Sequence, residues 1–548
     1  MHHRRTRRPV IRAAAALSAL CLISSCAADP GPPPLVEPEE RPAKASQDTE
    51  TASSSAEEPD QQSDRPRAQV GIDPIRAGFN PHLIGDESAT VRGIADLVLP
   101  SAFTPDGEKD PNLLAGASVL ATSLDVFTVR YVIANNAQWS DGTPITGADF
   151  AYLWRGMTQT PGVVDPAAYR AVSNVRVSGP GGKVVDVDFA QPVGDWRVLF
   201  RHLLPSHLLE ADAADFAYAL RNTVPASAGR YLVRTVDRAH GTVTLNRNDR
   251  FWGPDPAPID ILTLAATRDT TQVADQLRSG QLAFVDMAPQ DTTADVLGLI
   301  PGAQTRVFPG ARTLGVTISA TSGLSAQARA EVRSLVDVPL LAHIAARRST
   351  HVDTASPTAP GSLALLHALA AEGKVLRVAA DAADPSASAA ARSLVDLLDA
   401  AGVPAKVVVN ELPAVAGGGL PAGEVDLVVH WRSDGDSAAT LASRIACPPE
   451  QARAGNLSGL CSVAGDDIAR RILSGEIPPA LAAERVAEIE DREVLWVPIL
   501  RETRLAATAG GVRGSGAPVD AWPGGLSSAG GWKLADTVGR RSTIQEVQ

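Results

Sequence analysis

Long hydrophobic runs are missing from most of this 548-residue sequence. Beyond the N-terminal segment, no stretch of about 18 consecutive residues is apolar, although a membrane-spanning helix needs about 20. The sequence also lacks a phosphate-binding Gly-x-x-x-x-Gly-Lys loop, a His-Glu-x-x-His motif and a Gly-x-Ser-x-Gly motif. These are common signatures of nucleotide-binding and hydrolytic proteins. We therefore expect a protein that is not an enzyme and that uses no cofactor and no metal.

Positive charge is in deficit, and aromatic residues are scarce at 4%. The 50 Lys and Arg residues are outnumbered by 62 Asp and Glu residues, which gives a net charge of −12. This balance argues against nucleic acid as a partner. The hydrophobic fraction of 44% is ordinary for a folded protein. A chain of this length is too long for one compact core, so we expect two or three domains.

The first 26 residues are typical of a bacterial lipoprotein signal peptide and do not belong to the fold. Five arginines between residues 4 and 12 precede a short apolar run, 13–23, and Ile23-Ser24-Ser25-Cys26 resembles a lipobox. We expect Cys26 to carry lipid and to hold the protein on the extracytoplasmic face of the cell membrane. The alternative is plain secretion, with Cys26 incidental.

A polar segment, residues 27–66, follows the signal peptide. It is rich in Pro, Glu, Asp, Ser and Gln and has almost no apolar residues. Such a composition cannot bury enough surface to offset the entropy cost of ordering. We predict a disordered tether whose root-mean-square reach is about 35 Å.

Cysteine is scarce, with four in the whole sequence. Cys21 leaves with the predicted signal peptide, and Cys26 is assigned to lipid. Cys447 and Cys461 remain, 14 residues apart in an oxidising compartment. We expect a local disulfide that stabilises its loop by about 3 kcal/mol. No histidine lies at zinc-ligand spacing from either thiol.

Residues 127–157 predict a strand, a tight turn and a capped helix. In 127–133, Phe127, Val129 and the following odd positions are apolar and would share one face of a strand. An Asp-Gly turn comes next. Thr146 then stands at an N-cap position with Asp149 three residues later, which is the pattern of a capping box. Apolar residues at helical spacing continue to residue 157.

A second regular unit lies near the middle of the chain. Residues 375–380 predict a strand, 388–401 a helix that stops at Gly402, and 405–410 a second strand. This strand–helix–strand pattern indicates a parallel pair in an α/β domain. Residues 413–423 are rich in Gly and Pro, which indicates surface chain. Elsewhere, the largely apolar residues 196–209 predict a helix-like stretch interrupted by Pro205, and residues 314–318 predict a short strand.

Several motifs together resemble the family 5 extracytoplasmic solute-binding proteins, the peptide- and nickel-binding components of ABC importers. The matching segments stand in the family's order: 139–150, 225–233, 243–253 and 456–466. The resemblance extends over residues 68–535 and implies a two-lobed, periplasmic-binding-protein-like α/β fold with an extra subdomain in the first lobe. We expect lobe I at 67–312, lobe II at 313–493 and a return to lobe I at 494–548.

Four longer matches point to one group of lipoproteins within the family: 78–83, 97–103, 161–167 and 248–253. This narrower resemblance implies a regulator that directs a tetramannosylated phosphatidylinositol toward lipomannan and lipoarabinomannan, with an envelope mannosyltransferase as a partner. The alternative is a peptide receptor that delivers to an ABC permease. The expected ligand is thus a small molecule, a peptide or a glycolipid, captured by a hinged cleft in a monomer.

The resemblance also implies one ligand contact. In the family's peptide binders, an aspartate three residues after an aromatic, at the end of a strand of the second lobe, pairs with the ligand's ammonium group. Trp431 and Asp434 match that spacing. A surface turn, Ser-Asp-Gly-Asp, is the alternative interpretation. The family's Asp-Pro is absent because Ser437 follows Asp436, and Arg230 replaces another family proline, so peptide binding is in doubt.

Overall fold

The computed structural model describes residues 65–123, 126–209, 216–449, 453–514, 522 and 525–535. The chain divides into two units, residues 1–61 and 62–548, and only the second is described below. The predicted signal peptide, Cys26 and nearly all of the predicted tether lie outside the described residues.

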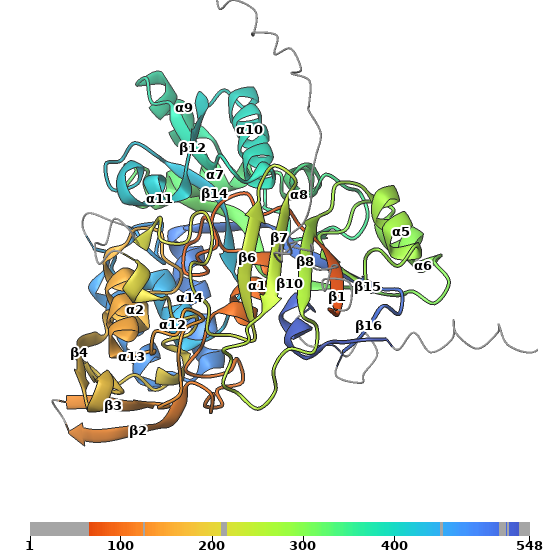
Figure 1. Ribbon diagram of the computed structural model, residues 1–548. Coiled ribbons are helices and arrows are strands. Elements are labelled where there is room, and N and C mark those ends of the chain that lie inside the picture. Colours follow the sequence, from red (N-terminus) through yellow and green to blue (C-terminus); the bar gives the residue numbers. More distant parts are fainter. Residues whose placement is uncertain are drawn as a thin grey trace, which may run out of the picture. The chain divides into compact units, whose positions relative to one another are not determined.

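A curved, mixed sheet of eleven strands runs through the second unit (Figure 1). Its strands are β1 (Arg67–Ile72), β6 (Tyr231–Asp237), β7 (Thr242–Arg247), β8 (Ile261–Ala266), β9 (Phe284–Met287), β10 (Gln304–Ile318), β11 (Asp353–Thr354), β12 (Leu376–Asp381), β13 (Ala405–Asn410), β14 (Leu427–Ser433) and β15 (Trp496–Thr508). The order is β13-β12-β14-β10-β15-β9-β1-β8-β7-β6, and β11 pairs with β15. The predicted parallel pairing is confirmed, because β12 lies parallel to β13.

The first hydrophobic core lies around β1, β7, β8 and a second sheet of four strands. That sheet has the order β2-β3-β5-β4, with β2 (Leu114–Ser123), β3 (Val126–Ile133), β4 (Val172–Ser178) and β5 (Val184–Phe189). Residues of six helices also belong to this core: α1 (Ala89–Val98), α2 (Gly147–Gln159), α3 (Ala167–Arg170), α12 (Ala438–Ile445), α13 (Val463–Ser474) and α14 (Pro479–Glu493). Trp532 completes it near the chain's end, with its ring centroid 4.7 Å from that of Phe284.

The second core lies where β10, β12 and β14 meet the start of β15. Four helices contribute to it: α7 (Ala326–Ser334), α8 (Val338–Ala346), α9 (Ala364–Ala371) and α10 (Pro385–Ala400). A smaller cluster packs α5 (Thr270–Arg278) and α6 (Thr293–Gly298) against β9 and β15. The remaining short elements are α11 (Leu412–Ala414), β16 (Val512–Arg513) and β17 (Lys533–Leu534).

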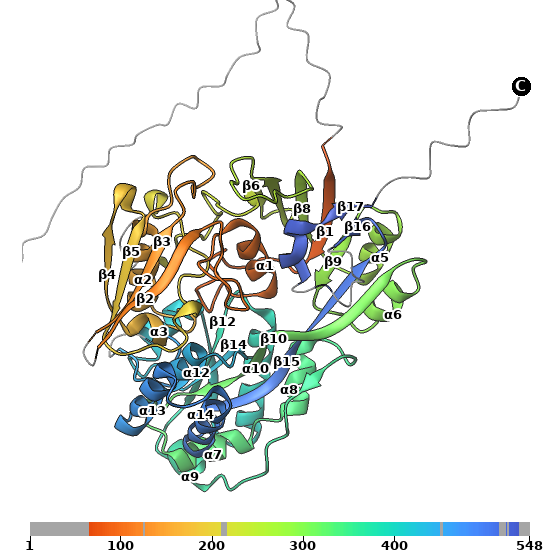
Figure 2. The same cartoon turned by 90° about the horizontal axis from the view of Figure 1, so that it is seen from below.

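Two long antiparallel strands, β10 and β15, connect these cores and lie side by side (Figure 2). At one end of β10, Val307 packs against the small cluster beside β9. At the other end, Leu314, Val316 and Ile318 are buried in the second core. The pairing of β10 with β15 has register shifts at 309–313 and at 314–315. The backbone is therefore irregular where it passes between the cores.

Three segments differ from the sequence-based expectations. Residues 314–318 are not a short strand but the end of β10, which has 15 residues. Residues 196–209, expected to be helix-like, form only 3-10 turns at Trp196–Val198 and Ser206–Leu208. Residues 413–423 are not surface chain, because Val415, Ala416 and Leu420 pack into a buried cluster. The predicted lobe limits stay a prediction, and α12–α14 pack with the first core.

The predicted capping box of α2 is confirmed. The Thr146 hydroxyl accepts a hydrogen bond from the backbone N–H of Ala148, 3.2 Å away, and Asp149 accepts the N–H of Thr146 at 2.9 Å. The other oxygen of Asp149 accepts hydrogen bonds from the backbone and the hydroxyl of Ser206. The cap therefore fixes both the start of α2 and the neighbouring 3-10 turn.

We predict that Thr146→Ala lowers the free energy of unfolding by about 1 kcal/mol, because it removes the N-cap acceptor. Urea titration followed by tryptophan fluorescence measures the change. Thr158→Ala, later in the same helix, is the matched control. The Thr158 hydroxyl bonds back to the carbonyl of Trp154, an arrangement that adds no stability to a helix. Equal losses in the two variants would contradict the capping role.

Candidate functional site

A cavity of about 660 Å³ lies between the two cores. On the side of the first core it is lined by the β1–α1 connection, residues 73–78 and 85–88, and by residues 287–292 after β9. On the opposite side it is lined by residues 345–348, which are the end of α8 and the two residues after it, and by the β12–α10 connection. Residues 500–504 of β15 line it as well. A smaller cavity of about 340 Å³ adjoins it, because both share residues such as Gly78, Asp86 and Asp381.

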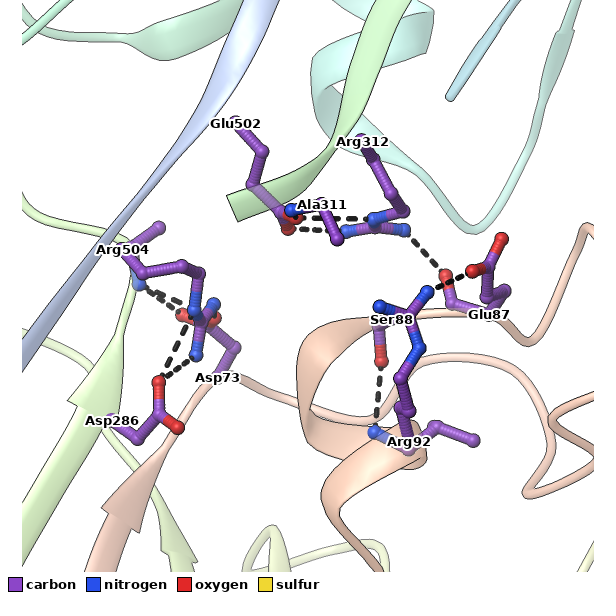
Figure 3. Close-up of polar contacts among 11 residues, drawn as sticks. Asp73, Glu87, Ser88, Arg92, Asp286, Ala311, Arg312, Glu502 and Arg504 are labelled. Carbon is purple, nitrogen blue, oxygen red and sulfur yellow. Dashed lines mark hydrogen bonds and ion pairs between the residues drawn. The ribbon is translucent and has the colours of Figure 1, made fainter. Parts of the chain in front are cut away.

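Buried ion pairs fill the region where β15 passes the cavity (Figure 3). Arg504 has a side chain only 5% exposed, and its Nη2 lies 2.6 Å from Oδ1 of Asp286. It also pairs with Asp73. Two residues earlier on the same strand, Oε1 of Glu502 lies 2.6 Å from Nη2 of Arg312 on β10. These pairs join β15 to β9, to β10 and to Asp73, the residue that follows β1.

A further link extends this network to the start of α1. Arg312 donates a hydrogen bond to the carbonyl oxygen of Glu87, whose carboxylate pairs with Arg92. Ser88 caps α1 by accepting the N–H of Val91 at 3.1 Å. The network therefore holds a helix of the first core against a strand that enters the second core.

The charges in this network hold one another ionised. Burial alone would raise the pKa of Glu502, but the adjacent Arg312 and Arg504 outweigh it and lower that pKa to about 2. Burial likewise opposes the charge of Arg504, yet the carboxylates of Asp73, Asp286 and Glu502 raise its pKa. Each charge is thus stable in the interior only while its partners are present.

Two other carboxylates, Asp86 and Asp381, line both cavities. Burial raises the pKa of each, and backbone hydrogen bonds oppose that shift. Asp86 accepts the N–H groups of Gly78 and Asn80, and Asp381 accepts that of Ala383 at 2.8 Å. Both carboxylates are therefore hydrogen-bond acceptors among the lining residues of the cavity.

Polar contacts also bridge the cleft directly. Asp291, on the first-core side, accepts hydrogen bonds from the backbone N–H and hydroxyl of Ser349 and from the N–H of Thr350. At the smaller cavity, Arg221 pairs with Glu411 at 2.8 Å. These exposed contacts can form only when the two sides of the cleft are close together.

Of the two predicted ligand contacts, the structure brings one to the cavity. Trp431 lines it, and the guanidinium carbon of Arg312 stands 5.1 Å from the Trp431 ring centroid. Asp434 is exposed and is not among the lining residues. Its carboxylate accepts the Thr313 hydroxyl at 2.9 Å, and its N–H bonds to the carbonyl of Ala311.

Sequence reasoning missed the arginines and carboxylates that dominate the cavity. One signal was present: Arg501-Glu502-Thr503-Arg504 is a polar run inside an otherwise largely apolar strand. Glu502 and Arg504, two residues apart, share one face of that strand, and such charges are almost never buried unless paired. The partners Asp73, Asp286 and Arg312 lie about 190 to 430 positions away in the chain, so no local pattern could have identified them.

The structure joins Cys447 and Cys461 in a disulfide, with the sulfur atoms 2.13 Å apart. Neither residue lines the cavity. Within the described residues, no group of three His, Cys, Asp or Glu side chains is placed to hold a metal ion. In that part of the chain, the helices also lack the combined length and hydrophobicity that membrane crossing requires.

Comparison with known proteins identifies the family. Residues 113–328 match the model of the bacterial extracellular solute-binding proteins, family 5 middle region. The "Probable monoacyl phosphatidylinositol tetramannoside-binding protein LpqW" of Mycobacterium tuberculosis is 34% identical over 452 residues, which are 70% of this chain and 71% of that protein. The chain belongs to the family 5 solute-binding proteins. It is of the LpqW type, and this family is not enzymatic.

Other proteins similar to this family 5 protein are named for binding oligopeptides or EDTA. The "Oligopeptide-binding protein OppA" of M. tuberculosis is 29% identical over 256 residues, covering 45% of this chain and 40% of that protein. Among solved structures, the oligopeptide-binding protein AppA from Bacillus subtilis in complex with a nonapeptide has a TM-score of 0.65 at 12% identity, with 86% of this chain and 100% of that chain covered. The periplasmic EDTA-binding protein EppA has a TM-score of 0.61 at 20% identity, with 86% and 97% covered. These likenesses confirm the predicted periplasmic-binding-protein-like α/β fold.

We predict that Glu502→Gln lowers the free energy of unfolding at pH 7 by about 3 kcal/mol, because it leaves Arg312 buried beside a neutral group. The pKa of Glu502 falls from its ordinary 4.5 to about 2 on folding. Its stabilising contribution is therefore complete above pH 4.5 and is lost as the pH falls toward 2. The variant should lose less stability than the wild type between pH 5 and pH 2.

Chemical denaturation at several pH values measures both effects. Glu488→Gln removes an exposed carboxylate paired with Arg485 at 2.9 Å, and it should change stability by less than about 0.5 kcal/mol. If the two variants behaved alike at pH 7, the buried network would not be the stabilising element described here.

Proposed function

We propose that this family 5 protein captures a glycolipid headgroup non-covalently in the cleft between its two cores, while lipid on Cys26 holds it at the extracytoplasmic face of the membrane. The observation that carries this proposal is the cavity of about 660 Å³ lined by segments of both cores. A ligand there contacts two parts of the chain at once. It therefore favours the arrangement in which they are close together.

The chemistry of the lining supports a polar headgroup as the part that enters. Charged side chains of both signs surround the cavity, including Arg312, Glu502 and Arg504. An acyl chain placed there would displace water from charged groups without replacing its hydrogen bonds, which is unfavourable. The Asp86 and Asp381 carboxylates can instead accept hydrogen bonds from sugar hydroxyls. We infer that any acyl chain stays outside the cleft.

The biological role that we propose follows the LpqW relative. The name of that relative describes binding of a monoacyl phosphatidylinositol tetramannoside. By this analogy the protein would bind such an intermediate as a monomer and influence phosphatidylinositol mannoside and lipoarabinomannan synthesis, with a mannosyltransferase as a partner. Association and release would involve no chemical step.

The second candidate is a peptide receptor that delivers to an ABC permease. The likeness to OppA over 256 residues favours it. A cavity with charges of both signs also suits a peptide with two charged ends. Asp434 does not add to this case, because it lies outside the lining.

Native mass spectrometry of the full chain, purified in mild detergent from its own envelope, tests the proposal. We expect a retained mass that fits a mannosylated phosphoinositide. A mixture of short peptides would instead support the receptor. Protein that carries no small molecule would contradict capture in either form.

Trp431→Ala should lower the fraction of protein that carries ligand, because Trp431 lines the cavity. Trp154→Ala is the matched control, since Trp154 packs against the first core and is not among the lining residues. Equal occupancy in the two variants would place the ligand outside this cleft.

A further inference from the structure

Arg348 follows α8 in a loop whose backbone is held in an unusual shape. Arg347 and His351 both have left-handed conformations, with φ of 53° and 52°, which is uncommon outside glycine. Between them, Ser349 and Thr350 bond to Asp291 across the cleft. Strained backbone that is held by specific contacts often marks a functional position. Here it sets Arg348 against the cavity, of which it is a lining residue.

The Arg348 guanidinium is buried without a full set of partners. The residue is 8% exposed. Its Nη2 donates to the carbonyl of His351 at 3.1 Å, whereas its Nε has no hydrogen-bond partner within the described structure. A buried charged donor without a partner is costly. Burial lowers the pKa of Arg348, and the opposing influence of Asp291 and Asp73 does not cancel that shift.

The neighbouring carboxylates are already engaged elsewhere. Asp73 accepts the N–H of Ala288 and pairs with Arg504. Oδ1 of Asp291 accepts the N–H groups of Ser349 and Thr350. Neither carboxylate forms an ion pair with Arg348 among the contacts of the described residues. Among the described residues, the guanidinium charge of Arg348 therefore has no carboxylate paired with it.

Two more arginines, Arg268 and Arg347, line the same cavity. Arg347 precedes Arg348 in the chain. The backbone carbonyl of Arg268 accepts a hydrogen bond from the side chain of Gln290 at 3.4 Å, which brings the Arg268 backbone close to the segment that carries Asp291. We call Arg268, Arg347 and Arg348 the Arg348 cluster. In the described part of the chain, no ion pair is formed by any of the three. Guanidinium groups bind phosphate and carboxylate through paired hydrogen bonds.

We propose that the Arg348 cluster is an oxyanion subsite of the cleft, which binds a phosphate or carboxylate group of the captured ligand. This inference rests on the proposed function and names one group that the ligand must carry. A phosphodiester of a lipid headgroup and the terminal carboxylate of a peptide share the required chemistry.

Isothermal titration calorimetry with two matched pairs of soluble probes tests the subsite in the full chain. One pair is glycerophosphoinositol and myo-inositol, and the other is trialanine and trialanine amide. In at least one pair, we expect the member that carries the phosphate or carboxylate group to bind at least about tenfold tighter than the member that lacks it, as a charge-assisted contact implies. The pair that shows the preference identifies the source of the anion.

Arg348→Gln should abolish that preference, whereas Arg278→Gln should keep it within about twofold. Arg278 is not a lining residue of the cavity, is exposed and pairs with Asp275 at 2.6 Å, so the control removes an equal charge without touching the subsite. If Arg348→Gln does not fold, Arg268→Gln replaces it, because Arg268 is exposed. That variant should weaken the preference several-fold.

The subsite is overturned if the wild-type protein shows no anionic preference, or if the Arg348→Gln or Arg268→Gln variant retains it in full. A different result would overturn the proposed function. A neutral solute that co-purifies in the cleft would overturn the subsite and leave capture intact, whereas protein without any retained solute would overturn capture itself.

Discussion

The buried charges carried by β15 are the constraint on which the rest of the structure depends. Glu502 and Arg504 lie on the same strand two residues apart, and their partners come from β9, from β10 and from the residue that follows β1. Burying such groups is costly unless each meets an opposite charge in good geometry. The network therefore fixes the relative positions of these strands more tightly than apolar packing alone, which tolerates small shifts. It also leaves polar groups along the boundary of the cavity.

The two long strands determine where a ligand can bind. Because β10 and β15 run from one core to the other, the space beside them is lined by both cores. Some of the contacts across this space are exposed, such as those of Asp291 with Ser349 and Thr350 and the pair of Arg221 with Glu411. Exposed ion pairs contribute little stability. A ligand that contacts both sides can therefore shift the equilibrium toward the closed arrangement.

Local features of the fold could be predicted from the sequence, and long-range ones could not. The capping box of Thr146 and Asp149 and the parallel pair of β12 and β13 depend on neighbouring residues, and both predictions are confirmed. The length of β10 was missed, because the irregular segment around Pro309 interrupts the strand pattern. Residues 413–423 were misassigned because Gly and Pro usually mark surface chain, whereas Val415 and Leu420 here pack into a core.

The candidate site was harder to predict than the fold. Trp431 was found through family resemblance and does line the cavity, but Asp434 at the family spacing does not. The Arg348 cluster leaves no sequence signal, because its members come from two distant segments that meet only in the folded chain. Periodicity reports which face of an element is buried. It says nothing of which charges from remote elements come together.

The most direct test of this account is a crystal structure of the full protein purified, without added ligand, from its own envelope. The account predicts density for a bound polar group in the cavity between the cores, in contact with Trp431 on one side and with the segment 85–88 on the other. A cavity that holds only ordered water, with a co-purified ligand bound elsewhere on the surface, would contradict it.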